Sequence, residues 1–594
     1  MPGGVYITSG CYESSQNLVG FVEAAGRGST CRPPSQGRNE PELPSPIVET
    51  PRKILVAVAW PYAQGPLHLG HLAGAYLSPD IFARYHRAAG NDVLMVSGSD
   101  VHGTPITVKA EAEGVTPQEI VDRYHPEFLG YWKTLGIDFD LFTTTGTATH
   151  ARVAQGFFTK LLDNGHLYRK TVDQFYDEHH GRFLPDRYIE GTCPHCSYPH
   201  ARGDQCDNCG KTLDPVDLID PVSKLSGSRP VLRPTEHYYW RLSAFGEPLL
   251  KWLGSRHGWR PHVLNFAIGM VEEGLHDRSF TRDLDWGIPI PVDDLGPGKS
   301  IYVWWEAVMG YLSAPQEWAE LGGDPDAWKA WWEDPEAESY YFVGKDNVPF
   351  HAVYWPALLM GHGGLNLPTD VPANHFVTFG GEKASKSRGV GRSLGWYLER
   401  FEPDALRYAI GTNLPETNDT DLYDDEMVRS INDELVANWG NLVNRVVSMT
   451  HRYFHGVVPE RTAPGDEDVA LLERLAGAFD EVGGLIEQVK LRAALAVAMG
   501  AAQATNAYLS EAEPWQTAKT DLGRTGTTLN VALNAVALIA TVLAPFLPFT
   551  SRAILQDLGV DVPQAGPLWE PVVIHPGREI APPHPLFAKI EGGL

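Results

Sequence analysis

The chain has 594 residues, a formal net charge of −26, and 43% hydrophobic and 21% charged residues. A chain of this length is too long for one hydrophobic core, so we expect several domains in an ordinary globular protein. The acidic balance argues against a protein that coats nucleic acid non-specifically, although a local basic surface would suffice for contacts with RNA phosphates.

Residues 1–50 form an N-terminal tail rich in glycine, serine and proline, which predicts disorder. The tail lacks a basic start followed by a long apolar run, so a signal peptide is not expected there.

The first predicted element is a buried strand over 53–60, a short apolar run with β-branched residues that is bounded by Pro61. A loop leads from this strand to a helix that begins near His68. Residues 78–80 (Ser-Pro-Asp) look like a fresh helix start, with serine as the cap and proline in the first position. We therefore expect the helix to be interrupted there.

A second strand is predicted over 92–97, and it ends at Gly98-Ser99-Asp100. The next helix opens with a capping box over 116–119, which also has proline in the first turn. Strand, loop, helix and strand in this order predict the beginning of a parallel α/β sheet. Ligands of such sheets bind beyond the carboxyl ends of the strands.

From about residue 149 to residue 300 the sequence becomes an insertion rich in Gly, Pro and Asp. Parallel-sheet character is expected to return over 301–303 and 340–344, with one more strand over 375–379. After about residue 424 the apolar residues follow a 3.6-residue period over 427–454, 466–508 and 525–555, which predicts a helical bundle.

The segment Leu529–Pro548 is apolar enough to be mistaken for a membrane span. It contains Asn530, Asn534 and Thr541 and is broken by two prolines, so a buried bundle helix is the preferred interpretation.

His68, Gly70 and His71 belong to the first turn of the helix that follows the first strand. A helix N-terminus has unpaired backbone N–H groups and a partial positive charge, so anions bind there. The two histidines add side-chain donors on the same turn. By themselves they could equally be histidines at an exposed helix end.

Lys383, Ser385 and Lys386 lie on a polar loop more than three hundred residues later, with glycines on both sides. Glycine on both sides suits a mobile loop, whose lysines can move onto transferring phosphates where charge builds up in the transition state. A solvated basic turn is the alternative. Together, and in this order, the two motifs predict a site that holds a triphosphate from two sides.

Cys193, Cys196, Cys206 and Cys209 form two C-x-x-C pairs separated by nine residues. Four thiolates at this spacing can close a tetrahedral zinc site, and because protein fills all four positions we expect a structural metal. Clustering of four of the six cysteines also favours a reducing, cytoplasmic compartment over a disulfide scaffold.

Aromatic residues gather over 303–311 and again at Phe350 and His351. Core packing is the ordinary explanation, but strand ends on a nucleotide-binding sheet are also where a small apolar substrate would bind. Asp100, at the end of the second strand, could pair with a substrate ammonium group or act as a plain cap.

The two phosphate-binding motifs resemble the signature pair of class I aminoacyl-tRNA synthetases. Further segments are similar to the methionyl-tRNA synthetase family: Pro61–Gly65, Leu184–Tyr188, Tyr302–Ala307, Gly344–Asp346 and Asp404–Tyr408. The likeness covers nearly everything from Lys53 to Glu591. Relatives for isoleucine, leucine and valine carry a much larger editing insertion, for which the distance between the two motifs is too short.

The resemblance implies a ligase that activates methionine with MgATP and transfers it to tRNA(Met). It implies ATP binding by His68, Gly70, His71, Lys383, Ser385 and Lys386, with His68, His71, Lys383 and Lys386 as the catalytic residues. It implies an amino-acid site made of Trp60, Tyr62, Asp100, Arg282, Trp304, Ala307, Tyr311 and His351.

In the helical region the resemblance implies that Asn441, Arg445 and Trp515 read the anticodon. Single-stranded RNA is read by stacking on aromatic side chains and by hydrogen bonds to exposed base edges, which suits these residue types. Trp515 could also be a packing residue at a helix end.

The expected fold is α/β, with a Rossmann-like parallel-sheet catalytic domain split by a zinc-knuckle insertion and followed by an α-helical anticodon-binding bundle. The expected boundaries are 1–50 for the disordered tail, 51–148 and 301–374 for the two halves of the catalytic domain, 149–300 for the connective insertion, 375–424 for the Lys/Ser-loop region, 425–560 for the bundle, and 561–594 for a C-terminal tail that packs back. The C-terminal dimerisation module of some members is missing, so we expect a monomer, which binds neither DNA nor a membrane.

Trp60, Val308, Asn347 and Ala384 differ from the commonest residues of the family, and we interpret them as subfamily variation. The altered pocket positions support one alternative, an amino-acid-adenylating paralogue that uses no tRNA, but the intact bundle speaks against it. Another alternative, a tRNA-binding or regulatory protein without catalysis, conflicts with the presence of both phosphate-binding motifs.

Overall fold

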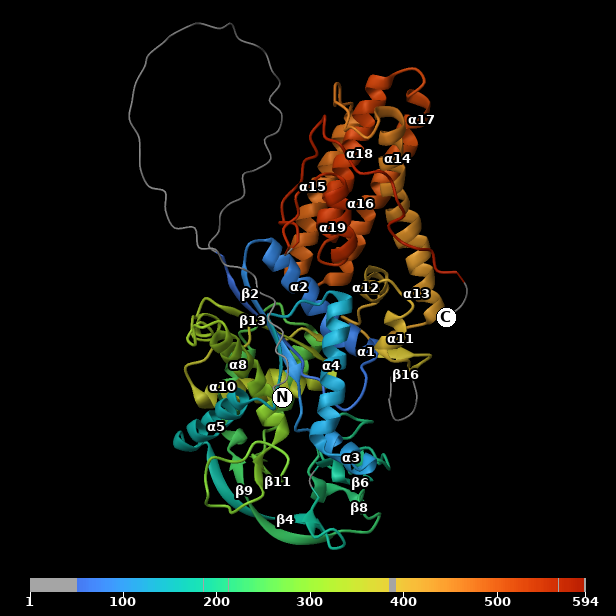
Figure 1. Ribbon diagram of the computed structural model, residues 1–594. Coiled ribbons are helices and arrows are strands. Elements are labelled where there is room, and N and C mark those ends of the chain that lie inside the picture. Colours follow the sequence, from blue (N-terminus) through green and yellow to red (C-terminus); the bar gives the residue numbers. More distant parts are fainter. Residues whose placement is uncertain (1–50, 185, 212, 384–390, 565, 592–594) are drawn as a thin grey trace, which may run out of the picture. The chain divides into compact units, whose positions relative to one another are not determined.

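The computed structural model describes residues 51–594 except 185, 212, 384–390, 565 and 592–594. The tail expected over 1–50 and most of the Lys/Ser loop therefore lie outside the described residues. The fold is α/β, with a parallel sheet, an insertion that carries antiparallel strands, and a helical bundle at higher residue numbers (Figure 1).

The central sheet has five strands in the order β14-β13-β1-β2-β3, and all of its pairings are parallel. The strands are β1 (Lys53–Val58), β2 (Asp92–Ser99), β3 (Leu141–Thr144), β13 (Glu338–Gly344) and β14 (Ala373–Asn374). The side chains from Ile54 to Val58 in the middle strand are fully buried, as expected for a parallel strand covered on both faces. The strands predicted over 53–60, 92–97 and 340–344 are confirmed.

The helix after β1 begins with α1 (Leu69–His71) and continues through a π-helical segment, η1 (Leu72–Tyr76), into α2 (Leu77–Ala88). The prediction of a new helix start at residues 78–80 is therefore wrong, because the irregularity is a π-helical segment that ends just before them. The chain does not leave the helix; the turn widens just before Pro79, whose missing N–H would otherwise cost a hydrogen bond inside a regular helix.

The strand predicted over 301–303 does not belong to the parallel sheet. β12 (Lys299–Ile301) pairs antiparallel with β11 (Thr281–Asp283), and Val303 is already the first residue of α8 (Val303–Leu321). A short buried apolar run has the same pattern in a helix as in a strand, which explains the error. The strand predicted over 375–379 exists as β15 (Val377–Phe379), in a separate sheet with β16 (Glu382–Lys383) and β17 (Thr420–Asp421).

The insertion contains a long antiparallel pair, β4 (Leu167–Asp177) with β9 (Val231–Trp240), and a small sheet around the cysteines. Its other elements are α5 (Ala148–Asp163), β5 (Arg182–Phe183), η2 (Asp186–Tyr188), β6 (Ile189–Thr192), β7 (Ala201–Arg202), β8 (Ile219–Ser223), α6 (Gly246–Leu253), α7 (Pro261–Glu272) and β10 (Arg278–Ser279). The remaining helices around the sheet are α3 (Thr104–Glu113), α4 (Pro117–Leu135), the π-helical η6 (Phe350–Tyr354), α10 (Trp355–His362), α11 (Leu394–Leu398) and α12 (Pro403–Gly411).

The helical bundle, orange to red in Figure 1, confirms the predicted helical region with two corrections. Its helices are α13 (Asp424–Ser430), η7 (Ile431–Gly440), α14 (Asn441–Phe454), α15 (Asp466–Glu487), α16 (Leu491–Ala512), α17 (Pro514–Thr517), α18 (Leu522–Leu543) and α19 (Pro548–Asp557). The helix predicted over 466–508 is two helices, because the chain turns at Val489, whose φ is 53°. The segment predicted over 525–555 is also two helices, α18 and α19.

Helix α18 is long and apolar enough to cross a membrane, but 89% of its most apolar window is buried inside the protein. It packs against α14, α15, α16 and α19, so the apolar segment is a bundle core helix, as predicted.

A buried ion pair joins helices α12 and α2, and its arginine also reaches the bundle. Arg407 of α12 lies 2.7 Å from the carboxylate of Asp80 in α2, and both side chains are fully buried. Arg407 also donates hydrogen bonds to the carbonyl oxygens of Leu135, Pro545 and Phe546. One guanidinium group thus ties together α2, the end of α4 and the corner between α18 and α19.

Candidate functional site

A crevice with a volume of about 1180 Å³ lies beyond the carboxyl ends of β1, β2 and β13. It brings together most of the residues selected from the sequence: Trp60, Tyr62, His68, Gly70, His71, Asp100, Trp304, Ala307, Tyr311 and His351. This is the position at which ligands bind to open parallel sheets.

The two histidines form one wall of the crevice. His68 is the N-cap of α1, its backbone N–H donates to Nδ1 of His71 at 3.2 Å, and the two rings lie 3.9 Å apart. A Cβ atom at Gly70 would come within 2.9 Å of the His68 ring, so glycine is needed between them. The first turn of the helix and its two imidazoles therefore line the same crevice, where an anion site would lie.

The Lys/Ser loop can be placed through its flanks. Lys383 ends β16, which forms a hairpin with β15, while the Lys383 side chain, Ser385 and Lys386 lie outside the described residues. After the loop, Ser393 forms an antiparallel bridge with His68, and the N–H of Leu394 donates to the carbonyl of Leu67 at 2.7 Å. The chain that leaves the loop thus runs directly alongside the histidine motif.

An aromatic pocket forms the inner part of the crevice. Tyr311 donates from its hydroxyl to Nε2 of His351 at 2.8 Å, while Nδ1 of His351 lies 2.9 Å from the carbonyl of Asn347. Burial lowers the pKa of His351 to about 4, so the ring is neutral, and these contacts put its proton on Nδ1. Tyr62 and Trp304 pack edge to face with their centroids 6.2 Å apart.

Trp60 fits into this pocket because two glycines lie against its indole. A Cβ atom at Gly98 would lie 2.2 Å from the Trp60 ring, and one at Gly310 would lie 2.7 Å from it. Any other residue at these two positions would push the indole out of place. The unusual tryptophan is therefore matched by its surroundings.

Asp100 lies at the closed end of the crevice, directly after β2, and is 4% exposed. Its Oδ1 accepts a hydrogen bond from the N–H of His102 at 3.2 Å, and its own N–H and carbonyl bond to Pro61 and Ala63. Burial, and then the nearby charge of Glu306, raise the pKa of Asp100 well above its ordinary value. A cationic group on a ligand would restore the charged form.

Arg282 is the selected residue that the structure does not bring into the crevice. It lines a separate cavity of about 60 Å³, where its guanidinium lies 3.6 Å from the ring centroid of Tyr302. Gln205, Arg278, Trp304, Phe350 and Tyr354 line both cavities, so the one that Arg282 lines adjoins the crevice.

The four cysteines come together as expected, with their sulfur atoms all within 4.8 Å of one another. Sγ of Cys193 is 3.9 Å from that of Cys209, and Sγ of Cys196 is 3.6 Å from that of Cys206. Sulfur ligands about 2.3 Å from a tetrahedral zinc ion lie roughly 3.8 Å apart, so the cluster has the right size. The amide of Asn208 and the N–H of His195 donate toward two of the sulfurs, which favours thiolates.

The structure brings two of the three residues predicted to read the anticodon close together and places the third on the same helix as one of them. Asn441 and Arg445 lie one turn apart on α14, and the Arg445 guanidinium is 5.7 Å from the Trp515 ring centroid. Trp515 is half-buried in α17, so part of its ring stays accessible.

Two residues of the family-like segments line the crevice although they were not predicted to be site residues. Arg187 lies 5.6 Å from the Tyr62 ring centroid and is paired with Asp204, and Lys345 is paired with Asp419 at the other wall. Both are cations in polar segments after strands or turns, the signal that could have identified them. Phe266 on α7 also lines the crevice and is 48% exposed, which no sequence pattern indicated.

Comparison with family models places most of the chain in two known domains. Residues 54–447 match the model described as tRNA synthetases class I (M). Residues 458–593 match the anticodon binding domain of methionyl tRNA ligase.

Individual relatives agree with these matches. The chain is 50% identical to a methionine–tRNA ligase of Roseiflexus sp. (strain RS-1), over 92% of this chain and 98% of that protein. It is 48% identical to a methionine–tRNA ligase of Thermomicrobium roseum, over 91% and 97%. Among solved structures, Mycobacterium tuberculosis methionyl-tRNA synthetase bound by methionyl-adenylate is similar, with a TM-score of 0.75, 27% identity, and coverage of 91% of this chain and 100% of that chain.

Proposed function

The chain belongs to the methionyl-tRNA synthetase family of class I aminoacyl-tRNA synthetases, and from this premise we propose that it activates L-methionine with ATP and transfers it to the 3′ end of tRNA(Met). The observation that carries the proposal is the crevice itself. Asp100 and an aromatic pocket lie at its closed end, and the His68 and His71 turn lies on its wall.

The geometry suits attack of an amino-acid carboxylate on the α-phosphate of ATP. Asp100 holds the ammonium group, and Trp60, Tyr62, Trp304, Ala307, Tyr311 and His351 enclose the thioether side chain. The carboxylate then attacks in line, its bond to phosphorus forms, and pyrophosphate leaves. The chain supplies positioning and neutralisation of phosphate charge, and no covalent enzyme intermediate is needed.

The phosphates of MgATP are held from two sides. His68, Gly70 and His71 act from the helix N-terminus, and Lys383, Ser385 and Lys386 act from the loop. The bridge between Ser393 and His68 supports this arrangement, because it brings the chain beside the loop to the histidine motif. Arg282, which the family likeness assigned to the amino-acid site, lines the adjoining cavity together with Trp304.

The tRNA is recognised at the far end of the bundle by Asn441, Arg445 and Trp515. An accessible indole beside a guanidinium group offers an unpaired base both a stacking surface and hydrogen-bond donors. Cys193, Cys196, Cys206 and Cys209 hold one structural zinc ion, which would reinforce the small apolar core that includes Cys193 and Cys206. We propose a cytoplasmic monomer, in keeping with the reduced cysteine cluster.

The test is ATP–pyrophosphate exchange with each of the twenty amino acids, followed by charging of purified tRNA(Met). We expect exchange with methionine and formation of methionyl-tRNA. Exchange without charging would instead support the tRNA-independent paralogue, and exchange with a different amino acid would contradict the proposed substrate.

A further inference from the structure

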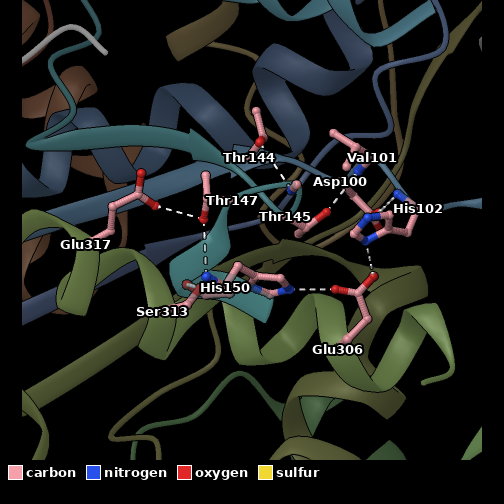
Figure 2. Close-up of polar contacts among 12 residues, drawn as sticks. Asp100, Val101, His102, Thr144, Thr145, Thr147, His150, Glu306, Ser313 and Glu317 are labelled. Carbon is pink, nitrogen blue, oxygen red and sulfur yellow. Dashed lines mark hydrogen bonds and ion pairs between the residues drawn. The ribbon is translucent and has the colours of Figure 1, made fainter. Parts of the chain in front are cut away.

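Behind the amino-acid pocket lies a buried carboxylate held between two histidines. Glu306 of α8 is fully buried, and its two oxygens accept hydrogen bonds from Nδ1 of His102 at 2.8 Å and from Nε2 of His150 at 2.5 Å. Nδ1 of His150 lies 2.7 Å from the hydroxyl of Ser313, which lies further along α8. Figure 2 shows that each histidine contacts a different oxygen of Glu306.

His102 connects this cluster to the substrate-binding carboxylate. Its imidazole contacts Glu306, and its backbone N–H donates to Oδ1 of Asp100 at 3.2 Å. The neighbouring Val101 is fixed by hydrogen bonds to Thr145 and to the indole N–H of Trp286. His102 therefore links Glu306 to Asp100 through two hydrogen bonds, and its neighbour Val101 is itself held in place.

The groups around Glu306 and Asp100 shift the pKa values of these two carboxylates in opposite directions. Glu306 faces His102, His150 and Asp100; Asp100 faces Glu306 and Tyr311 of α8, and Arg187 of η2. Burial works against ionisation of Glu306, but His102 and then His150 outweigh it and lower the pKa of Glu306. The charged Glu306 in turn adds to the effect of burial in raising the pKa of Asp100.

We propose that Glu306 is a positioning residue of the amino-acid site: held between His102 and His150, it orients the loop that carries Asp100 and makes the charge on Asp100 depend on a ligand ammonium group. This inference deepens the proposed function and rests on it. Without a bound cation, two neighbouring buried carboxylates repel each other. A substrate ammonium relieves that repulsion, so uncharged analogues gain nothing from Asp100.

The test is the pH profile of kcat/KM for methionine in pyrophosphate exchange, for the wild type and for Glu306→Gln. The acid limb of this profile reports the pKa of the free enzyme's essential carboxylate. Glutamine has the same shape and can both accept from one histidine and donate to the other. Because it removes the charge that raises the pKa of Asp100, we expect the acid limb to move to lower pH, by on the order of one unit.

Matched variants separate charge from structure. Glu317→Gln removes a carboxylate from the same helix and is expected to leave the limb in place. Glu317 lies further along α8 and accepts hydrogen bonds from Thr143 of β3 and from Thr147; Figure 2 shows the contact with Thr147. Glu306→Asp keeps the charge and should keep the limb near its wild-type position. The KM for ATP should be unchanged in all of these variants.

A partly unfolded variant lowers the whole profile without moving its limb, so loss of protein cannot imitate the expected result. If Glu306→Gln does not fold, His150→Gln serves instead. Removing one of the groups that keep Glu306 ionised should move the limb in the same direction by a smaller amount.

An unmoved limb in folded Glu306→Gln, or an equal shift in Glu317→Gln, would overturn the inference. Failure of the proposed function would look different, because exchange with methionine would then be missing from the wild type at every pH.

Discussion

Asp80 and Asp100 are both buried aspartates near the central sheet, but their surroundings are opposite. Asp80 lies 2.9 Å from Arg84 and 2.7 Å from Arg407, and although burial opposes ionisation, the two arginines hold the pKa of Asp80 below its ordinary value. Asp100 faces another carboxylate, and burial and then that neighbouring charge raise its pKa. A carboxylate whose charge is fully balanced stabilises the structure, whereas one left under-balanced is prepared for a cationic ligand.

The largest expected effect is on the structural carboxylate. Arg407→Met leaves Asp80 buried beside a single arginine and frees three carbonyl oxygens, so the free energy of unfolding should fall by about 3–5 kcal/mol. Urea denaturation measures this change. The double variant Asp80→Asn/Arg407→Met should recover part of the loss; if it is no more stable than the single variant, the ion pair is not the reason.

Asp100→Asn should instead affect binding with little effect on stability. Hydrogen bonds to charged groups contribute about 1.5–3 kcal/mol, so the KM for methionine should rise roughly ten- to a hundredfold. The KM for ATP should not change, because we propose that the histidine turn and the Lys/Ser loop hold the nucleotide. An unchanged KM for methionine would remove Asp100 from the amino-acid site.

Smaller again is the expected effect at Arg84. This side chain is 18% exposed, and water can take over part of its interaction with Asp80. We expect Arg84→Ala to lower the free energy of unfolding by about 1 kcal/mol, well below the effect at Arg407. Equal effects at the two arginines would contradict the view that Arg407 is the principal partner of Asp80.

The two carboxylates should also titrate in different pH ranges. The lowered pKa of Asp80 contributes stability that is present above the unfolded-state value of about 4 and is lost as pH falls through the lower folded-state value. The raised pKa of Asp100 means that methionine affinity decreases on acidification at higher pH than this. Over the same pH series, methionine affinity should therefore fall at a higher pH than the urea concentration at the unfolding midpoint. A decrease of both at the same pH would contradict the comparison.

The sequence was sufficient where chemistry is carried by residues close together in the chain. Local patterns identified the His68–His71 turn, the strand before it and the four cysteines. In the structure the turn lines the crevice, and the four sulfur atoms form one cluster. The widened helix at Leu72–Tyr76 was missed because a Ser-Pro-Asp pattern marks a helix start equally well.

Contacts between distant residues could not be predicted in this way. His102, His150 and Glu306 come from three different elements, and each looks like an ordinary polar residue in its own segment. The fit of Trp60 depends on Gly98 and Gly310, which lie against it only after the sheet and α8 have packed. Arg282 carried a family likeness, but in the folded chain its guanidinium lies against the ring of Tyr302, in the cavity beside the crevice.

The most direct test is a crystal structure of the protein with a non-hydrolysable methionyl-adenylate analogue. We expect the ammonium group of the analogue within hydrogen-bonding distance of Asp100 and its phosphate beside His68 and His71. Its thioether should lie between Trp60, Tyr311 and His351. An analogue bound with its ammonium group turned away from Asp100, or bound outside the crevice, would contradict it.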